Sequence, residues 1–277
     1  MDYKIIVDSS CDLTDEQREL YGIISVPFTM RLGEKEFLDD EGLDYDNYMC
    51  EMKLTTQKVG SAAPSPHEFQ KAMEVAKNSY VVTISGQLSA SYQNAMIAKT
   101  HVEETGTARA HVFDSKSASA AEHLTALKIY ELMQKKASRE QIISTVQQFI
   151  DNMKTYFVLE RYDNLYKNGR LNKIAGKLLE IINVKLVMGT DGNGNIAHHA
   201  NARNIKHMID ILLSYIGKSG RKTEEENIVI SHCDNLDLAE RFSNAVRKMY
   251  TFKNIIIVHT GGLSSLYADH KGIVLAF

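Results

Sequence analysis

Short apolar runs rich in β-branched residues alternate with longer segments of helical periodicity along the 277-residue chain. The short runs lack polar alternation, which is typical of strands buried on both faces of a sheet. Such alternation indicates an α/β fold with a mostly parallel sheet and helices on both faces. The expected strands span residues 4–7, 80–84, 111–113, 227–231 and 254–259.

Two of the helical segments carry start signals. Thr14 precedes one segment, with Gln17 at the reciprocal position of a capping box. Ser65 precedes another, with Pro66 at the first helical position and Glu68 at the third. The second signal predicts a helix that runs to about residue 78. Further helices are expected at about residues 90–103, 120–134, 139–152, 205–216 and 236–249.

The middle of the chain interrupts the alternation of strands and helices. A strand is expected at residues 156–159, then a polar stretch at 164–173 and a helix near 174–182. A hairpin follows, with strands 184–188 and 195–199 joined by a turn rich in Gly, Asn and Asp, residues that tolerate positive φ. We therefore predict two domains, an N-terminal one over residues 1–154 and a C-terminal one over residues 155–277.

Charge and cysteine content limit the function classes. The formal net charge is -3 and the pI is about 6.4, which disfavours nucleic-acid binding. No segment has the ~20 consecutive apolar residues of a membrane span, and the N-terminus does not resemble a signal peptide. The chain has three cysteines, Cys11, Cys50 and Cys233, which are far apart in the sequence. An odd number of widely spaced cysteines favours reduced thiols in the cytoplasm. We therefore expect no integral membrane segment and at most transient membrane contact.

Small hydroxyl residues gather where predicted strands end. They occur in four loops, at residues 8–10, 60–66, 84–92 and 113–117. The carboxyl ends of parallel strands converge on one crevice, where helix N-termini and hydroxyls suit an anion. The alternative is that these residues only cap helices, which is our interpretation of Ser65. Asp8 and Asp114 are expected to organise their loops by accepting backbone N–H bonds.

Catalytic and cofactor motifs are weak in this sequence. Ser89 lacks the G-x-S-x-G spacing of a nucleophile elbow, and no Walker A or G-x-G-x-x-G loop occurs. The adjacent pairs His198-His199 and His232-Cys233 would point to opposite faces of strands, which disfavours a metal site. We expect no catalytic residue, metal or cofactor. A serine esterase or thioesterase that uses Ser89 and His259 stays open, as does a regulatory module without a ligand.

An ordered set of motifs resembles the DegV family. Residues 7–13 are similar to its DSS-x-DL opening, residues 61–66 to TS-x-PSP, and residues 84–92 to ISS-x-LSGTY. Shorter similarities follow in family order across the whole chain, at residues 113–115 (V-x-DS), 167–171 (KGGRI), 201–203 (KAR) and 257–262 (H-x-GPG). The sequence departs from these motifs at Ala62, Ala63, Gly86, Ala90, Ser91, Asn168, Gly262 and Leu263.

The resemblance implies a bacterial protein with two α/β domains, the second containing a mixed sheet, that binds a long-chain fatty acid between them. It implies that serine hydroxyls hold the carboxylate, and that a partner fatty-acid kinase phosphorylates it while this protein serves as a non-catalytic carrier. Carried over by position, the ligand-binding candidates are Ser61, Ser85, Ser89, Ser91, Arg203 and His259. Arg170 matches an arginine associated with the kinase partner and phosphoryl transfer.

Overall fold

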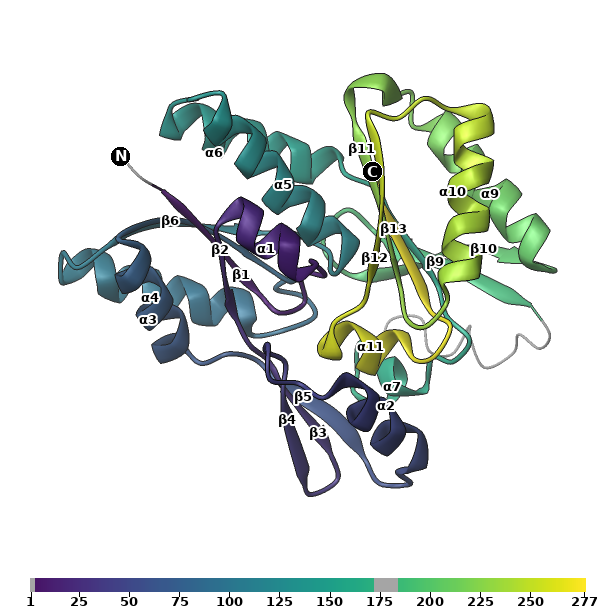
Figure 1. Ribbon diagram of the computed structural model, residues 1–277, viewed down its shortest axis with the longest axis horizontal. Coiled ribbons are helices and arrows are strands. Elements are labelled where there is room, and N and C mark those ends of the chain that lie inside the picture. The colour runs from purple at the N-terminus through teal and green to yellow at the C-terminus, as the bar shows by residue number, and fades with distance from the viewer. Residues whose placement is uncertain (1–2, 172–183) are drawn as a thin grey trace.

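The computed structural model describes residues 3–171 and 184–277, and its N-terminal part is built on a parallel sheet (Figure 1). The strand order is β2-β1-β6-β7, comprising β1 (Lys4–Asp8), β2 (Ile23–Val26), β6 (Asn78–Thr83) and β7 (Arg109–Asp114), and each neighbouring pair is parallel. All of these strands but β2 correspond to predicted runs.

Helices cover both faces of this sheet, as predicted. On one face, Ile6 and Val81 pack against Phe69 of α3 (Pro66–Ala76) and Val102 of α4 (Ser91–Glu104). On the other face, strand residues such as Ile5 pack against α5 (Ala120–Gln134) and α6 (Arg139–Asn152). The predicted capping boxes are present before α1 (Asp15–Tyr21) and α3.

A second, smaller sheet was not predicted. Its three strands are β3 (Thr29–Leu32), β4 (Lys35–Leu38) and β5 (Val59–Ala62), in the antiparallel order β4-β3-β5, and α2 (Tyr45–Leu54) lies beside it. β5 contains Ser61, so this sheet positions one of the predicted ligand residues.

The C-terminal part contains a six-stranded mixed sheet of order β10-β9-β8-β13-β11-β12. Its strands are β8 (Thr155–Val158), β9 (Lys185–Thr190), β10 (Ile196–Ala202), β11 (Asn227–His232), β12 (Asn254–His259) and β13 (Ile273–Ala276). The β9–β10 hairpin is confirmed, and β11–β12 is the parallel pair. Helices α9 (Ile205–Lys218) and α10 (Leu236–Met249) cover the outer face, whose core includes Leu212 and Phe242.

Helix α5 lies between the parallel sheet and the mixed sheet (Figure 1). Ala120, Ala121 and Leu124 near its start pack with Val229 and Val258 of the mixed sheet. Later residues of the same helix pack on the parallel sheet. Among the described strands, each sheet is formed entirely from strands before residue 154 or entirely from strands after it. The domain boundary at residue 154 stays a prediction.

Three shorter helices complete the described elements. The polar stretch predicted at residues 164–173 overlaps α7 (Asp163–Lys167), and a 3₁₀ turn spans Thr223–Glu225. Helix α11 (Gly262–Ala268), which was not predicted, packs against α2, α7, β3 and β5. The predicted helix at residues 174–182 lies outside the described residues.

Candidate functional site

A cavity lies where the three sheets and α11 meet. The carboxyl-end loops of β1, β6 and β7 provide one wall, and strands of the mixed sheet provide another. Most of the lining is apolar, which suits a ligand with an extended apolar body. The apolar lining residues are Phe28, Ile84, Leu88, Ala118, Phe157, Leu159, Leu165, Ile196, Leu263, Ala268 and Val274.

Two of the predicted serines line this cavity. Ser61 is placed by the pairing of β5 with β3, and its hydroxyl lies 2.9 Å from that of Tyr267 on α11. Ser89 lies in the loop before α4, where its hydroxyl accepts the backbone N–H of Ser91 at 3.2 Å. Both hydroxyls sit in positions from which a ligand oxygen could be bound.

Arg170 also lines the cavity and is the charged member of the described lining residues. Its Nε donates to the carbonyl of Leu88 at 3.2 Å, a second guanidinium nitrogen donates to the carbonyl of Asn168, and its guanidinium lies 5.8 Å from the centre of the Tyr267 ring. These contacts hold a cation against the wall that carries Ser61. An arginine fork in an apolar cavity is suited to a carboxylate or phosphate.

The other two predicted serines use their hydroxyls within the protein. Ser85 is buried and donates to the carbonyl of Gly194 in the β9–β10 turn at 2.8 Å. Ser91 is buried at the start of α4 and donates to Asp8 at 2.5 Å. Neither is among the residues that line the cavity. Ligand contact by Ser85 or Ser91 stays a prediction.

Arg203 lies on the surface, in the turn between β10 and α9. Its backbone N–H donates to Nδ1 of His207 at 3.3 Å. Arg203 is also absent from the residues that line the cavity. Its role at the head group stays a prediction.

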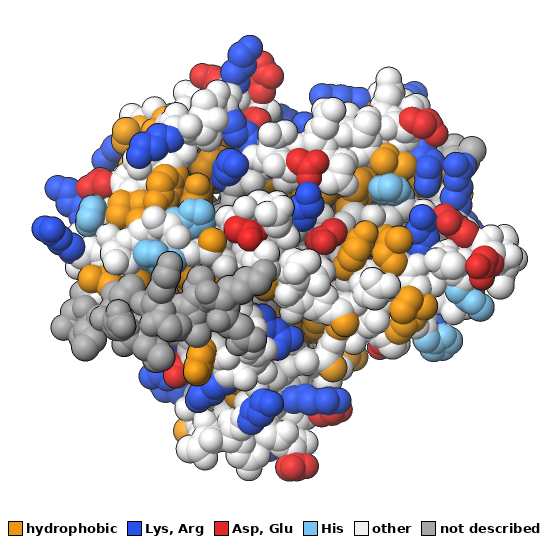
Figure 2. Space-filling view, turned by 180° about the vertical axis from the view of Figure 1, so that it is seen from behind, with side chains coloured by type: hydrophobic (Ala, Val, Ile, Leu, Met, Phe, Trp, Pro, Cys, Tyr) orange, Lys and Arg blue, Asp and Glu red, His pale blue; other side chains and the backbone are white. Residues whose placement is uncertain are grey.

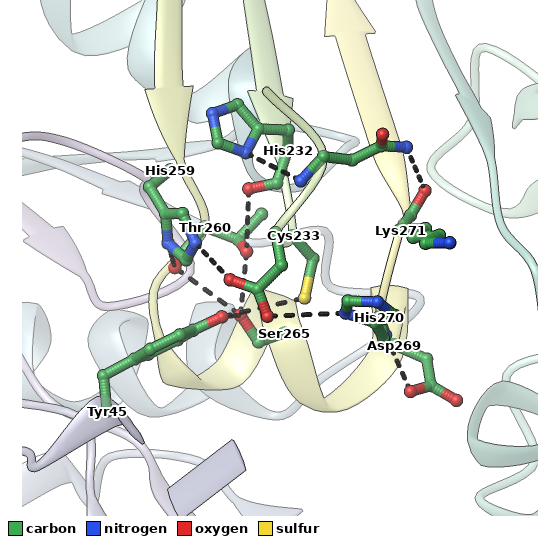
Figure 3. A network of polar contacts seen from close by, with 11 residues as sticks. Tyr45, His232, Cys233, His259, Thr260, Ser265, Asp269, His270 and Lys271 are labelled. Atoms are coloured by element: carbon green, nitrogen blue, oxygen red, sulfur yellow. Dashed lines mark hydrogen bonds and ion pairs between the residues drawn. The ribbon is translucent and has the colours of Figure 1, made fainter. Parts of the chain in front are cut away.

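His259 belongs to a polar network at the carboxyl ends of β11 and β12, beside α11 (Figure 3). Its Nε2 lies 2.9 Å from Asp234, and its Nδ1 lies 2.9 Å from the carbonyl of Thr260. Tyr45 meets the His259 ring edge-on and bonds with Ser265 of α11 at 2.9 Å. The network anchors one side of α11, while the cavity lies on another side; ligand contact by His259 stays a prediction.

Several hydroxyls of the cavity wall were not predicted as ligand residues. They are Ser10, Ser117, Ser119, Thr155, Thr190, Ser264 and Tyr267. Ser10 and Ser117 fall in loops that the sequence singled out, which is the signal that could have found them. Ser264 and Tyr267 lie on the unpredicted helix α11, so no sequence pattern pointed to them.

Four buried acids stand behind this wall. Asp8 organises its loop as predicted, accepting the backbone N–H groups of Ser10 and Ile84 at 3.2 and 3.0 Å. Burial raises the pKa of Asp8 and of Asp12 to about 6, and it raises the pKa of Asp39 and Glu122 as well. The second predicted loop organiser, Asp114, accepts the backbone N–H groups of Lys116 and Gly86 at 2.8 and 3.3 Å.

Two of these acids join the N-terminal part to α11. Asp12 accepts the backbone N–H of Gly261 at 2.8 Å, and Asp39 accepts those of Gly262 and Leu263 at 2.8 and 2.9 Å. Since Leu263 and Ser264 line the cavity, the two carboxylates fix the position of its α11 wall.

Within residues 3–171 and 184–277, no cluster of three His, Cys, Asp or Glu side chains is arranged to hold a metal ion, and no helix is long and apolar enough to cross a membrane. Lys and Arg side chains are interspersed with Asp and Glu on the face in Figure 2, without a single basic patch. The three cysteines form no disulfide.

The fold and the cavity define an α/β protein whose sheets enclose a mainly apolar pocket with an arginine and hydroxyls in its wall. A family model described as "Uncharacterised protein, DegV family" matches residues 2–276. The chain belongs to the DegV family.

Relatives and solved structures agree with this assignment. A DegV domain-containing protein of Streptococcus pyogenes serotype M1 is 33% identical over 281 residues, covering 100% of this chain and 99% of the relative. One of Streptococcus gordonii is 34% identical over 284 residues, with the same coverage.

Two solved structures at 31% identity carry fatty acids. A DegV family protein from Ruminococcus gnavus, refined with vaccenic acid, gives a TM-score of 0.94 and covers 100% of both chains. The Streptococcus pneumoniae fatty acid kinase (Fak) B3 protein, loaded with linoleic acid, gives a TM-score of 0.90 and covers 100% of this chain and 99% of its own.

Proposed function

We propose that this protein binds one long-chain fatty acid in the cavity and presents its carboxylate to a fatty acid kinase in the cytoplasm. The observation that carries this proposal is the placement of Arg170, Ser61 and Tyr267 together at the wall of a mainly apolar cavity. One cation and several hydroxyls match a single carboxylate, and apolar walls match an acyl chain. The protein acts as a carrier without chemistry of its own.

The energetics of such a ligand suit the cavity. Burial of a sixteen-carbon chain contributes roughly 12 kcal/mol at ~0.8 kcal/mol per CH₂, before the costs of association and ordering are subtracted. The apolar walls thus provide most of the affinity, while Arg170, Ser61 and Ser89 orient the head group.

Presentation to a kinase requires that the carboxylate be reachable. Arg170 lies in the loop that follows α7 and is only partly buried, so it links the cavity to the surface. The similarity to the fatty acid kinase B3 protein of Streptococcus pneumoniae supports a kinase as the partner.

The experiment is to measure the lipid that co-purifies with the protein. Native mass spectrometry should detect about one fatty acid per chain, and a delipidated sample should take up hexadecanoate in the same ratio. Incubation of loaded protein with a bacterial fatty acid kinase and ATP should then give acyl phosphate. A protein that stays empty through both steps would disprove carriage of fatty acid.

The double variant Ser61→Ala/Ser89→Ala should bind hexadecanoate at least about 100-fold more weakly, since two hydrogen bonds to a charged group are lost. Ser144→Ala is a matched control, because Ser144 lies exposed on α6 and bonds within its own helix. Labelling of Ser89 by a fluorophosphonate would instead indicate an activated nucleophile and favour an esterase.

A further inference from the structure

Three hydroxyls of the cavity wall are hydrogen-bonded to other groups of the protein. Ser10 Oγ donates to Glu122 Oε1 at 2.7 Å, and Ser119 Oγ donates to Asp12. Ser264 Oγ donates to the carbonyl of Ser10 at 3.4 Å. All three serines line the cavity, and Ser264 is bonded directly to Ser10. We call this group the triple-serine wall.

Two hydroxyls of the triple-serine wall, those of Ser119 and Ser264, offer a ligand acceptors and no donors. A serine hydroxyl has one proton and two lone pairs. Since Ser119 donates to Asp12 and Ser264 donates to a backbone carbonyl, the lone pairs of these two hydroxyls are what remains for the cavity. This differs from the neighbouring wall at Arg170, whose N–H groups donate.

The charged groups near the two walls also differ: carboxyl groups lie near the triple-serine wall, and a guanidinium lies at the Arg170 wall. Asp12 and Glu122 are fully buried directly behind the triple-serine wall, and Asp8 and Asp39 are close by. None of the four has a hydrogen bond or ion pair with a Lys or Arg among the described residues. A carboxylate would therefore be disfavoured here, whereas a neutral group that donates a hydrogen bond would be stabilised.

We propose that the cavity is built for a long-chain fatty acid that carries a hydroxyl group close to its carboxylate, with this hydroxyl donating to the triple-serine wall. The inference rests on the proposed function and specifies its substrate class. Ser264 and Tyr267 lie three residues apart on α11, so their Cβ atoms are about 5–6 Å apart. Since the wall and the head-group residue Tyr267 share α11, the ligand hydroxyl is expected on the carboxylate half of the acyl chain and not at its methyl end.

The test compares hexadecanoic, 3-hydroxyhexadecanoic and 16-hydroxyhexadecanoic acids on delipidated full-length protein by calorimetry or fluorescence competition. The 3-hydroxy acid should bind roughly fivefold more tightly than hexadecanoic acid, as expected for one additional hydrogen bond. The 16-hydroxy acid should bind more weakly than hexadecanoic acid, because its hydroxyl would be buried against apolar side chains.

The Ser264→Ala variant tests the assignment to the wall. Its ratio of dissociation constants for hexadecanoic and 3-hydroxyhexadecanoic acid should fall from about five to about one, while Ser144→Ala keeps the wild-type ratio. Ser10→Ala should lower the ratio in the same direction. The ratio reports on the hydroxyl alone, because any general loss of affinity affects both acids.

The outcomes separate this inference from the proposed function. Tight binding of hexadecanoic acid with no advantage for the 3-hydroxy acid would overturn the inference and leave the carrier function standing. A preference for the 16-hydroxy acid, or an unchanged ratio in Ser264→Ala, would also overturn it. Failure of all three acids to bind would overturn both.

Discussion

Arg170 brings a positive charge to a wall formed mainly by uncharged side chains. Its guanidinium is held by the carbonyls of Leu88 and Asn168 and lies over the Tyr267 ring, so little ordering is needed when a carboxylate arrives. We predict that Arg170→Ala weakens hexadecanoate binding by about 10- to 100-fold, as expected for a lost hydrogen bond to a charged group.

The matched control for this prediction is Arg161→Ala. Arg161 is exposed in the loop before α7 and does not line the cavity. Titration of both variants with hexadecanoate and with hexadecanol separates charge from packing, since the alcohol has no carboxylate. An Arg170→Ala variant that loses equal affinity for acid and alcohol would show that the arginine acts through packing alone.

At the residue scale, the sequence predicted the loops that border the cavity better than it predicted which hydroxyl of a loop lines it. Ser85, Ser89 and Ser91 occupy one loop, yet only Ser89 lines the cavity. Ser85 is turned away by Gly194, 109 residues later, and Ser91 by Asp8, 83 residues earlier. These partners are fixed by tertiary packing, which local residue spacing does not encode.

The β9–β10 hairpin is the element whose turn sets the shape of one cavity wall. Thr190 and Ile196 at its two ends line the cavity, and Gly194 between them contacts Ser85. Gly192 and Gly194 both have positive φ, at +85° and +89°. A Cβ at Gly194 would lie 2.3 Å from Ser85 Oγ, whereas one at Gly192 would meet nothing within 4 Å.

This pair gives a controlled prediction. Gly192→Ala should lower the free energy of unfolding by about 1 kcal/mol, the cost of placing a side chain at positive φ. Gly194→Ala should cost at least about 1 kcal/mol more, because Ser85 Oγ can move only by giving up its bonds to Gly194 and Gln87. Urea denaturation measures both; equal losses in the two variants would contradict a tight fit between the hairpin and Ser85.

The elements that the sequence predicted have strong local signals, and those that it missed are held by distant contacts. Helices α5, α6 and α10 have the predicted bounds, and the capping box at Ser65 marks the start of α3. Strands β3 and β4 have polar residues such as Arg31 and Glu36 and pair only with each other and β5. Helix α11 contains serines and a glycine, which are poor helix formers. Its first turn depends on Asp12 and Asp39, more than 220 residues away.

The whole molecule is held together around α5 and α11, and Asp12 contributes to both contacts. It accepts the hydroxyl of Ser119 just before α5 and the backbone N–H of Gly261 just before α11. It is fully buried, and burial raises its pKa to about 6, against ~3.9 for an unfolded aspartate. The folded protein therefore holds this proton more tightly than the unfolded chain does. The resulting stability is fully present below about pH 4 and is lost as the pH rises through 6.

Other buried groups titrate in the same range, so a variant is needed to isolate Asp12. Burial raises the pKa of Asp8 to about 6, whereas it lowers the pKa of His111 and His123 to about 4, which has the opposite effect on stability. Between pH 5 and pH 7.5, we predict that the wild type loses about 1 kcal/mol of unfolding free energy relative to Asp12→Asn, whose amide does not titrate.

Urea denaturation of both proteins at the two pH values gives this difference. Asp210→Asn, which removes an exposed carboxylate on α9, is the control for a general change in surface charge. A wild-type protein that gains stability relative to Asp12→Asn as the pH rises would mean that the bonds to Ser119 and Gly261 outweigh the cost of burying the charge. The carboxylate between α5 and α11 would then act as a net stabilising link at neutral pH, and the α11 wall of the cavity would be firmest where Asp12 is ionised.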